Sequence, residues 1–146
     1  MIILFPNIKF SNHKENEVRI RNNSIIKYFL NYGNFGSREW RISKEIKNGN
    51  NKIKSEWLKS FFNDEAKISG KRIIVSSVNK IGLCDVKYLL DSLDINNKFF
   101  DYSKNCFKYN LVVYDFKKYK KLVGFDHEIK KVKLDNLIKR LNNFGR

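Results

Sequence analysis

The residue types that most often carry enzyme chemistry are few in this sequence of 146 residues, and they are scattered. His13, His127, Cys84 and Cys106 lack the spacing of zinc ligands, and there is no glycine-rich phosphate loop and no Ser-His-Asp order. The two cysteines are far apart in the sequence, so we expect neither a disulfide nor a CxxC metal site, and we interpret both as reduced thiols in the core. Two features remain that could serve chemistry: Glu65, an acid at the end of an apolar helix, and a large excess of basic residues.

The basic excess points to a polyanionic partner. Lysine and arginine number 30 against 15 aspartate and glutamate residues, which gives a formal net charge of +15. Such a charge repels itself unless a polyanion neutralises it, so the composition favours a nucleic-acid partner. The alternative is that a Lys- and Asn-rich proteome gives every protein this composition, in which case the charge is incidental and the chain is a scaffold.

Length and the apolar N-terminal run bound the class of protein. A chain of 146 residues suffices for one α/β or α+β domain with a modest core, so residues 1–146 are expected to form a single domain. The apolar run 2–5 is cut by Pro6 and is shorter than a signal-peptide core or a membrane span. We therefore expect a cytoplasmic protein without a membrane partner.

The helix that positions Glu65 is predicted over residues 55–66. Ser55 is a candidate N-cap, and the apolar face ends near Glu65. Residues four apart on a helix share a face, so packing residues and the terminal acid can be fixed together. The apolar face consists of Trp57, Leu58, Phe61 and Phe62.

Further helices are predicted from apolar positions at helical spacing. The first follows the capping pair Asn23-Ser24 and ends at Gly33. The others cover residues 79–93, residues 116–123 before Gly124, and residues 128–142. The positions expected inside are Ile81, Val86, Leu89, Leu90 and Leu93 in the second of these, and Ile129, Val132, Leu134, Leu137, Ile138 and Leu141 in the last.

Strands are predicted between these helices. Residues 2–10 and 17–21 form a hairpin, residues 71–78 form a strand after a turn at Ser69-Gly70, and residues 98–114 form a hairpin turned near Lys104-Asn105. Residues 34–51 are interpreted as a polar connector. The hairpin-then-helix order at 8–33 and 98–124 suggests one and a half repeats, although any two hairpin–helix units share such a plan.

The segment 57–66, Trp-Leu-Lys-Ser-Phe-Phe-Asn-Asp-Glu-Ala, resembles the motif helix of LAGLIDADG homing endonucleases. The common form of that helix is an aromatic-Leu-Arg-Gly-Phe-Phe-Asp-Ala-Glu-Gly run, so the apolar face, a basic residue at Lys59 and the acid at Glu65 match. The resemblance continues through residues 55–142, with Ser76-Ser77 and Val123-Gly124-Phe125 in fitting places. Residues 1–50 then correspond to a partial first repeat and linker, and 51–146 to a complete repeat.

The resemblance implies a fold and a mechanism. The fold is α+β, with an antiparallel β-saddle and helices packed on one face. Two motif helices pack side by side, and each delivers one carboxylate to Mg²⁺ at the scissile phosphates, where the metal activates water and stabilises charge on the departing oxygen. The implied metal ligands are Glu65 and the backbone carbonyl of Ala66, and Lys130 is a candidate catalytic residue that polarises a phosphate or water. The implied dimer interface comprises Leu58, Ser60 and Phe61.

The saddle of this family lies in the major groove of DNA, with alternate side chains directed at bases and phosphates. Basic residues there would dominate affinity, and amide and arginine side chains could specify bases. The implied DNA-binding residues are Lys71, Lys98, Tyr102, Lys104, Lys108 and Asn110, with Lys9, Asn12, Lys14, Arg19 and Arg21 from the first hairpin.

Two functions are compatible with the resemblance. The first is a Mg²⁺-dependent endonuclease of intron or intein mobility that cleaves double-stranded DNA as a homodimer or heterodimer, because one chain supplies one motif helix. The alternative is a non-catalytic protein, degenerate or maturase-like, that binds DNA or RNA. It is favoured by the absence of a first motif helix and by Ser60, Asn63 and Ala66, which replace the family's Gly, Asp and Gly.

Overall fold

The computed structural model describes residues 11–14, 17–19, 23–31 and 36–144. The chain divides into two compact units, residues 1–32 and residues 33–146. Residues 36–50, which fall in the predicted polar connector 34–51, belong to the second unit. The predicted strand at 2–10 lies outside the described residues.

The first unit contains a hairpin followed by a helix. Strands β1 (Ser11–Lys14) and β2 (Glu17–Arg19) pair antiparallel, and helix α1 spans Asn23–Leu30. Strand β1 therefore lies between the two predicted strands 2–10 and 17–21, in a stretch that was not predicted to be a strand. The order of hairpin and helix agrees with that of residues 97–122 in the second unit, but a repeat relationship stays a prediction.

Helix α3 (Asn51–Glu65) carries the motif and begins earlier than predicted. The N-cap is Asn50, whose side-chain oxygen accepts a hydrogen bond from the backbone N–H of Ile53 at 3.0 Å. Asparagine caps a helix as well as serine does, so Ser55 lies inside the helix and the predicted start there was wrong. The helix ends at Glu65, one residue before the predicted end, and Ala66 is the C-cap residue.

Four strands form an antiparallel sheet in the order β3-β4-β6-β5. Their bounds are Lys67–Ser69, Arg72–Ser77, Asn97–Asp101 and Tyr109–Val113 for β3, β4, β5 and β6. The prediction of β4 and of the β5–β6 hairpin is confirmed, whereas β3 was not predicted. The β3–β4 turn contains Gly70 with φ +57°, a conformation that glycine adopts without steric cost.

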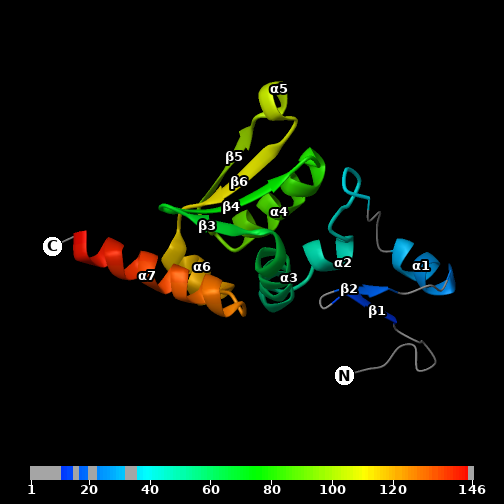
Figure 1. Cartoon of the computed structure of the whole chain (residues 1–146), viewed down its shortest axis with the longest axis horizontal. Coiled ribbons are helices and arrows are strands. Elements are labelled where there is room, and N and C mark those ends of the chain that lie inside the picture. Colours follow the sequence, from blue (N-terminus) through cyan, green and yellow to red (C-terminus); the bar gives the residue numbers. More distant parts are fainter. Residues whose placement is uncertain (1–10, 15–16, 20–22, 32–35, 145–146) are drawn as a thin grey trace. The chain divides into compact units, whose positions relative to one another are not determined.

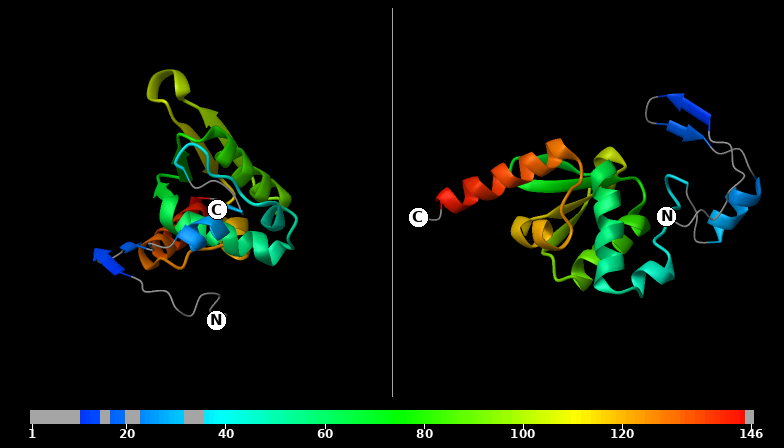
Figure 2. Two further views of the ribbon diagram at one scale, coloured as in Figure 1. Left: turned by 90° about the vertical axis from the view of Figure 1, so that its right-hand side faces the viewer. Right: turned by 90° about the horizontal axis from the view of Figure 1, so that it is seen from below.

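The helices of the second unit pack on one face of this sheet. Helix α4 spans Lys80–Ser92, α6 spans Phe116–Leu122 and α7 spans Glu128–Phe144, and short helices α2 (Lys44–Lys47) and α5 (Ser103–Cys106) complete the unit. Helices α3, α6 and α7 lie below the sheet in Figure 1 and in front of it when the molecule is seen from below in Figure 2. An α+β fold, with a four-stranded antiparallel sheet and helices, is therefore present.

The core lies between this face of the sheet and the helices. Leu58 and Phe62 of α3 are fully buried there, as are Ile73 of β4 and Leu111 of β6. The predicted inner positions Val86, Leu89, Leu90 and Leu93 of the α4 region are also buried, as are Leu134 and Leu137 of α7. Ile138 and Leu141 pack half-buried against the same core.

Some predicted core positions were wrong. Ile81 is 57% exposed, Ile129 63% and Val132 54%, because only one stripe of each helix faces the sheet and these residues lie off it. Cys84 and Cys106 are free, as expected, but both are exposed and are not core thiols. Among the described helices, none has the length and apolar character needed to cross a bilayer.

Candidate functional site

The strand register brings four of the six predicted DNA-binding residues of the second unit onto one face: Lys98, Tyr102, Lys108 and Asn110. Residues paired directly across antiparallel strands point to the same side of a sheet. Lys98 pairs with Val112, and Val112 with Ile74. Phe100 pairs with Asn110, and Asn110 with Ser76. Tyr102 and Lys108 continue this alternation one residue beyond the strand ends, where the Tyr102 N–H donates to the Lys108 carbonyl at 3.1 Å.

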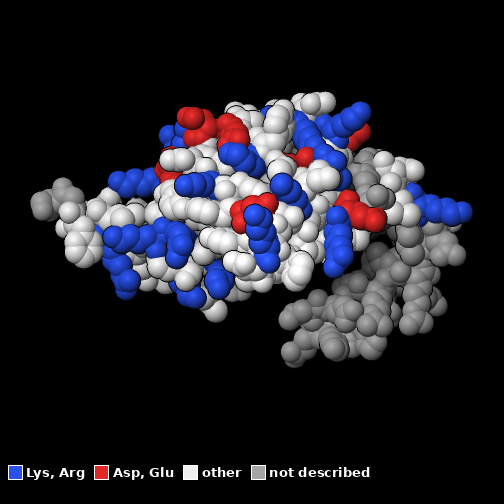
Figure 3. All heavy atoms as spheres, turned by 90° about the horizontal axis from the view of Figure 1, so that it is seen from above, with Lys and Arg blue, Asp and Glu red and all other residues white. Residues whose placement is uncertain are grey.

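We call this surface the open face. The opposite side of the sheet is buried against the helices, whereas the open face carries a lysine or arginine from every strand or from the residue next to it. These cations are all exposed, and Lys and Arg side chains are spread over the molecule seen from above in Figure 3. The residues of the open face are Lys67, Arg72, Ile74, Ser76, Lys98, Phe100, Tyr102, Lys108, Asn110 and Val112.

Side chains on the open face are ordered by contacts with one another. The Ser76 hydroxyl donates to Asn110 Oδ1 at 2.7 Å, which fixes the orientation of the Asn110 amide. The rings of Phe100 and Tyr102 stack with centroids 6.0 Å apart and planes inclined by 9°, and Lys98 Nζ lies 5.2 Å from the Phe100 centroid. The face therefore combines cations, an oriented amide and flat aromatic surface.

Lys67, Arg72 and Ser76 are open-face residues that the sequence analysis did not select. Arg72 and Ser76 alternate with the buried Ile73 and Val75 in β4, and this alternation was the available signal. Lys67 belongs to β3, which is three residues long and too short to give a pattern.

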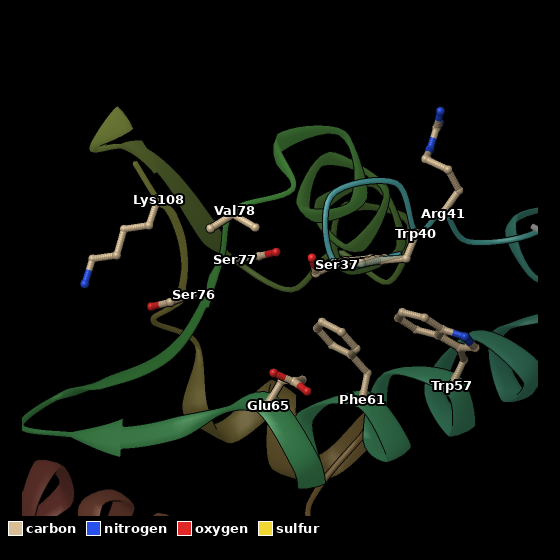
Figure 4. Close-up of a pocket in the computed structure, with 10 residues that line it drawn as sticks. All are labelled: Ser37, Trp40, Arg41, Trp57, Phe61, Glu65, Ser76, Ser77, Val78 and Lys108. Carbon is tan, nitrogen blue, oxygen red and sulfur yellow. The ribbon is translucent and has the colours of Figure 1, made fainter. Parts of the chain in front are cut away.

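A pocket of about 690 Å³ connects the end of α3 to the open face. Trp57 and Phe61 stack in it with centroids 5.1 Å apart, and Trp40 lies 5.4 Å from Phe61. Figure 4 shows Glu65 at the end of α3 facing the strand that carries Ser76, with Lys108 farther along the sheet. Because Ser76 and Lys108 belong to both surfaces, Glu65 adjoins the cationic sheet rather than lying remote from it.

The C-terminal end of α3 is tied to the connection between α6 and α7. Asn63 Oδ1 accepts hydrogen bonds from the backbone N–H groups of Asp126 at 3.0 Å and His127 at 3.3 Å. Lys130 Nζ donates to the carbonyl of Phe62 at 3.2 Å and to that of Asn63. The helix end that carries Glu65 is thus held in place. Lys130 pairs the Asn63 carbonyl, in the last turn where a helix leaves carbonyls unpaired, and shares the Phe62 carbonyl with the Ala66 N–H.

Lys130, the candidate catalytic residue, lies at the C-terminal end of α3, and a catalytic role for it stays a prediction. Its ammonium group is engaged by main-chain carbonyls of this helix end. Burial lowers the pKa of Lys130, and the nearby carboxylates of Asp64 and Glu65 act in the opposite direction. This geometry makes Lys130 a residue that positions the end of α3.

The donor set around Glu65 meets only some of the needs of Mg²⁺, which prefers several oxygen ligands in octahedral geometry. Glu65 lines the pocket and offers carboxylate oxygens of the right type, whereas the exposed Asp64 is not among the residues that line it. Across the described ranges, however, no group of three or more His, Cys, Asp or Glu residues could hold a metal. Ala66 is 3% exposed, and a metal contact from its carbonyl stays a prediction. The chain alone therefore fits part of a Mg²⁺ site.

The three residues of the implied dimer interface do not share one environment. Leu58 is fully buried in the core of its own unit and has no surface to offer a second chain, so it does not belong to such an interface. Ser60 is exposed and Phe61 is half-buried in the wall of the pocket. An interface along α3 would use the side that carries Ser60 and the 46%-exposed Ile53.

The segment before α3, interpreted above as a polar connector, is anchored by a buried carboxylate. Asp85 of α4 is 6% exposed and accepts hydrogen bonds from Arg41 Nε at 2.7 Å, Lys47 Nζ at 2.6 Å and the Ile42 N–H at 3.1 Å. Ile42 is itself in the core. Asp85 thereby holds in place the stretch that supplies Trp40 and Arg41 to the pocket.

Replacing Asp85 with Asn is expected to reduce the free energy of unfolding by about 2–4 kcal/mol, because a buried carboxylate paired with two cations is lost. Burial alone would raise the pKa of Asp85, but the bonds from Arg41, Lys47 and Ile42 outweigh it, and the pKa is lowered. The stabilisation is therefore full above the ordinary carboxyl pKa of about 4 and declines as pH falls through the lower folded value. Urea unfolding at several pH values measures this.

The control for this change is Asp91→Asn on the same helix. Asp91 has a side chain 52% exposed and pairs with Lys87 at the surface, so its loss is expected to cost less than about 1 kcal/mol. Equal effects of the two substitutions at neutral pH would contradict the anchoring role of Asp85.

The remaining predicted DNA-binding residues do not belong to the strands and strand ends that form the open face. Lys71 is exposed in the β3–β4 turn, with Nζ 5.8 Å from the Phe144 ring, and Lys104 is exposed in α5. Asn12, Lys14 and Arg19 lie on β1 and β2 of the first unit. Lys9 and Arg21 fall outside the described residues.

Comparisons with known proteins give no relative from which a function could be transferred. No family model matches the sequence, and neither a curated protein nor a solved structure matches the chain. The functional interpretation therefore depends on the open face, the pocket and the end of α3.

Proposed function

We propose that this chain is a DNA-binding protein of the LAGLIDADG type, whose open face contacts double-stranded DNA. The observation that supports this most strongly is the shared face of Lys98, Lys108 and Asn110, which the resemblance implied as DNA-binding residues. Lys67 and Arg72 add charge on the same side of the sheet. Helices cover the other side, whereas on this one Val112 is buried and the four cations are exposed.

The chemistry of the open face suits a nucleic-acid duplex. Lysine and arginine side chains neutralise phosphates and release condensed counterions, which provides affinity without regard to sequence. The Asn110 amide, oriented by Ser76, has the donor and acceptor groups that read an adenine edge in the major groove. The Phe100–Tyr102 pair supplies apolar surface beside them.

Binding to duplex DNA is expected to weaken steeply with salt. If each of the four open-face cations neutralises one phosphate, affinity should fall by about 10²-fold between about 50 and 200 mM salt. Fluorescence anisotropy with a labelled duplex measures this, with duplex RNA of the same sequence as competitor. Absence of binding at low salt would support the scaffold alternative, and preference for RNA would redirect the proposal to an RNA partner.

A second candidate function is phosphodiester cleavage by two associated chains. The observation that favours it is the position of Glu65, an exposed carboxylate that lines a pocket together with the open-face residues Ser76 and Lys108. Mg²⁺ bound there would activate water and stabilise charge on the departing oxygen. Because one chain fits only part of such a site, we propose that a second copy, packed along the Ser60 side of α3, supplies the other carboxylate.

A further inference from the structure

An exposed aromatic residue, Phe107, lies at the tip of the β5–β6 hairpin. Phe107 follows α5 and is 80% exposed, the second-largest exposure of any large apolar side chain in the described part of the chain. Lys104 and Lys108, both exposed, flank it in the sequence. An isolated exposed apolar residue needs no explanation, but its backbone conformation makes this one unusual.

Phe107 adopts the left-handed conformation, with φ 52° and ψ 31°. The other residues with positive φ in the described ranges are Gly70, Gly124 and Asp94. Glycine meets no steric penalty there and aspartate tolerates the conformation, whereas a bulky side chain is strained by its Cβ. Phenylalanine at this position therefore opposes folding twice, through backbone strain and through apolar surface left in water.

The surroundings of Phe107 indicate a partner for its ring. Its neighbour Lys108 belongs to the open face, and Lys108 is hydrogen-bonded through its carbonyl to Tyr102. Tyr102 in turn stacks on Phe100. Cations and flat rings thus run along the hairpin from the sheet toward its tip, a combination that binds a nucleic-acid backbone and the faces of bases.

We propose that Phe107 stacks on a nucleobase of the bound DNA, entering the base stack at the end of the open face. This inference rests on the proposed DNA-binding function and adds a contact that the cations alone do not provide. Aromatic and apolar side chains that enter a base step unstack it locally and bend the duplex. Lys104 and Lys108 on either side of the ring contact the adjoining phosphates.

The test compares Phe107→Ala and Phe107→Gly with Phe144→Ala in duplex-DNA titrations. Phe144 is 83% exposed at the end of α7 and serves as the matched control for loss of an exposed ring. We expect the Phe107 variants to bind DNA about tenfold more weakly, in line with the stacking of one base, and Phe144→Ala to bind as the wild type does. Phe107→Gly should also unfold at a temperature at or above that of the wild type, since glycine relieves the left-handed strain. Weaker binding by a more stable variant separates a contact with DNA from a structural role.

A second readout reports on the ring directly. Tryptophan introduced by Phe107→Trp should lose emission on addition of duplex DNA, beyond any change in Phe144→Trp, which has the same native tryptophans. Wild-type DNA affinity in Phe107→Ala, together with unchanged emission in Phe107→Trp, would overturn this inference and leave the proposed function intact. Failure of the wild type to bind DNA would overturn both.

Discussion

The double substitution Lys98→Glu/Lys108→Glu is expected to lower the affinity for duplex DNA by on the order of 100-fold at low salt. Lys98 lies in β5 and Lys108 immediately precedes β6, and both side chains are exposed on the open face. Each reversal removes a phosphate contact and adds repulsion. The slope of log affinity against log salt concentration should also become shallower by about 2, because each lost phosphate contact reduces it by about 1. Anisotropy titrations across a salt series measure both quantities.

The matched control is Lys117→Glu/Lys121→Glu, which changes the net charge by the same amount. These residues are exposed on α6, which lies below the sheet in Figure 1. Their replacement should change DNA affinity much less, because distant surface charges are screened within about 10 Å at moderate salt. Equal losses from the two pairs would mean that net charge, and not the open face, determines binding.

Glu65→Gln is expected to abolish Mg²⁺-dependent cleavage of plasmid DNA, with a rate loss on the order of 100-fold or more, if the second candidate function holds. The amide keeps the size of the side chain and removes the charge that a metal requires. Binding of duplex DNA should be retained or become tighter, because an exposed carboxylate beside the open face repels phosphate. Gel analysis of supercoiled, nicked and linear plasmid measures cleavage.

Asp64→Asn is the control for Glu65, since the two carboxylates are adjacent and both exposed at the end of α3. We expect Asp64→Asn to cleave at a rate close to that of the wild type. Cleavage that persists in Glu65→Gln would remove Glu65 from the catalytic role. A wild-type chain that binds DNA and never cleaves it would support the non-catalytic, degenerate or maturase-like alternative.

Much of the architecture was predictable because local patterns and burial agree in most elements. The strand prediction at 71–78 identified β4, and the apolar pattern of 116–123 before Gly124 predicted α6 and its stop. The predictions that were wrong or missing concern features that depend on contacts between residues distant in the sequence. Strand β3 exists because it pairs with β4, and Ile129 and Val132 are exposed because α7 presents a narrow stripe to the sheet.

The candidate site was predictable in part, for a related reason. The period of two in a strand is enough to place Lys98, Lys108 and Asn110 of the predicted hairpin on one face. It could not reveal Asp85, a single carboxylate in a helix, as the anchor for Arg41 and Lys47, because these residues lie 38 or more positions away in the sequence. The resemblance implied Lys130 as a candidate catalytic residue, but only tertiary geometry shows that it contacts backbone carbonyls of α3.

The central claim is that DNA lies on the open face. Lysine acetylation measured by mass spectrometry, with and without saturating duplex DNA, tests it at individual side chains. We predict that DNA slows the acetylation of Lys67, Lys98 and Lys108 and leaves that of Lys117 and Lys121 unchanged. Protection of the α6 lysines while the open-face lysines react freely would contradict the account.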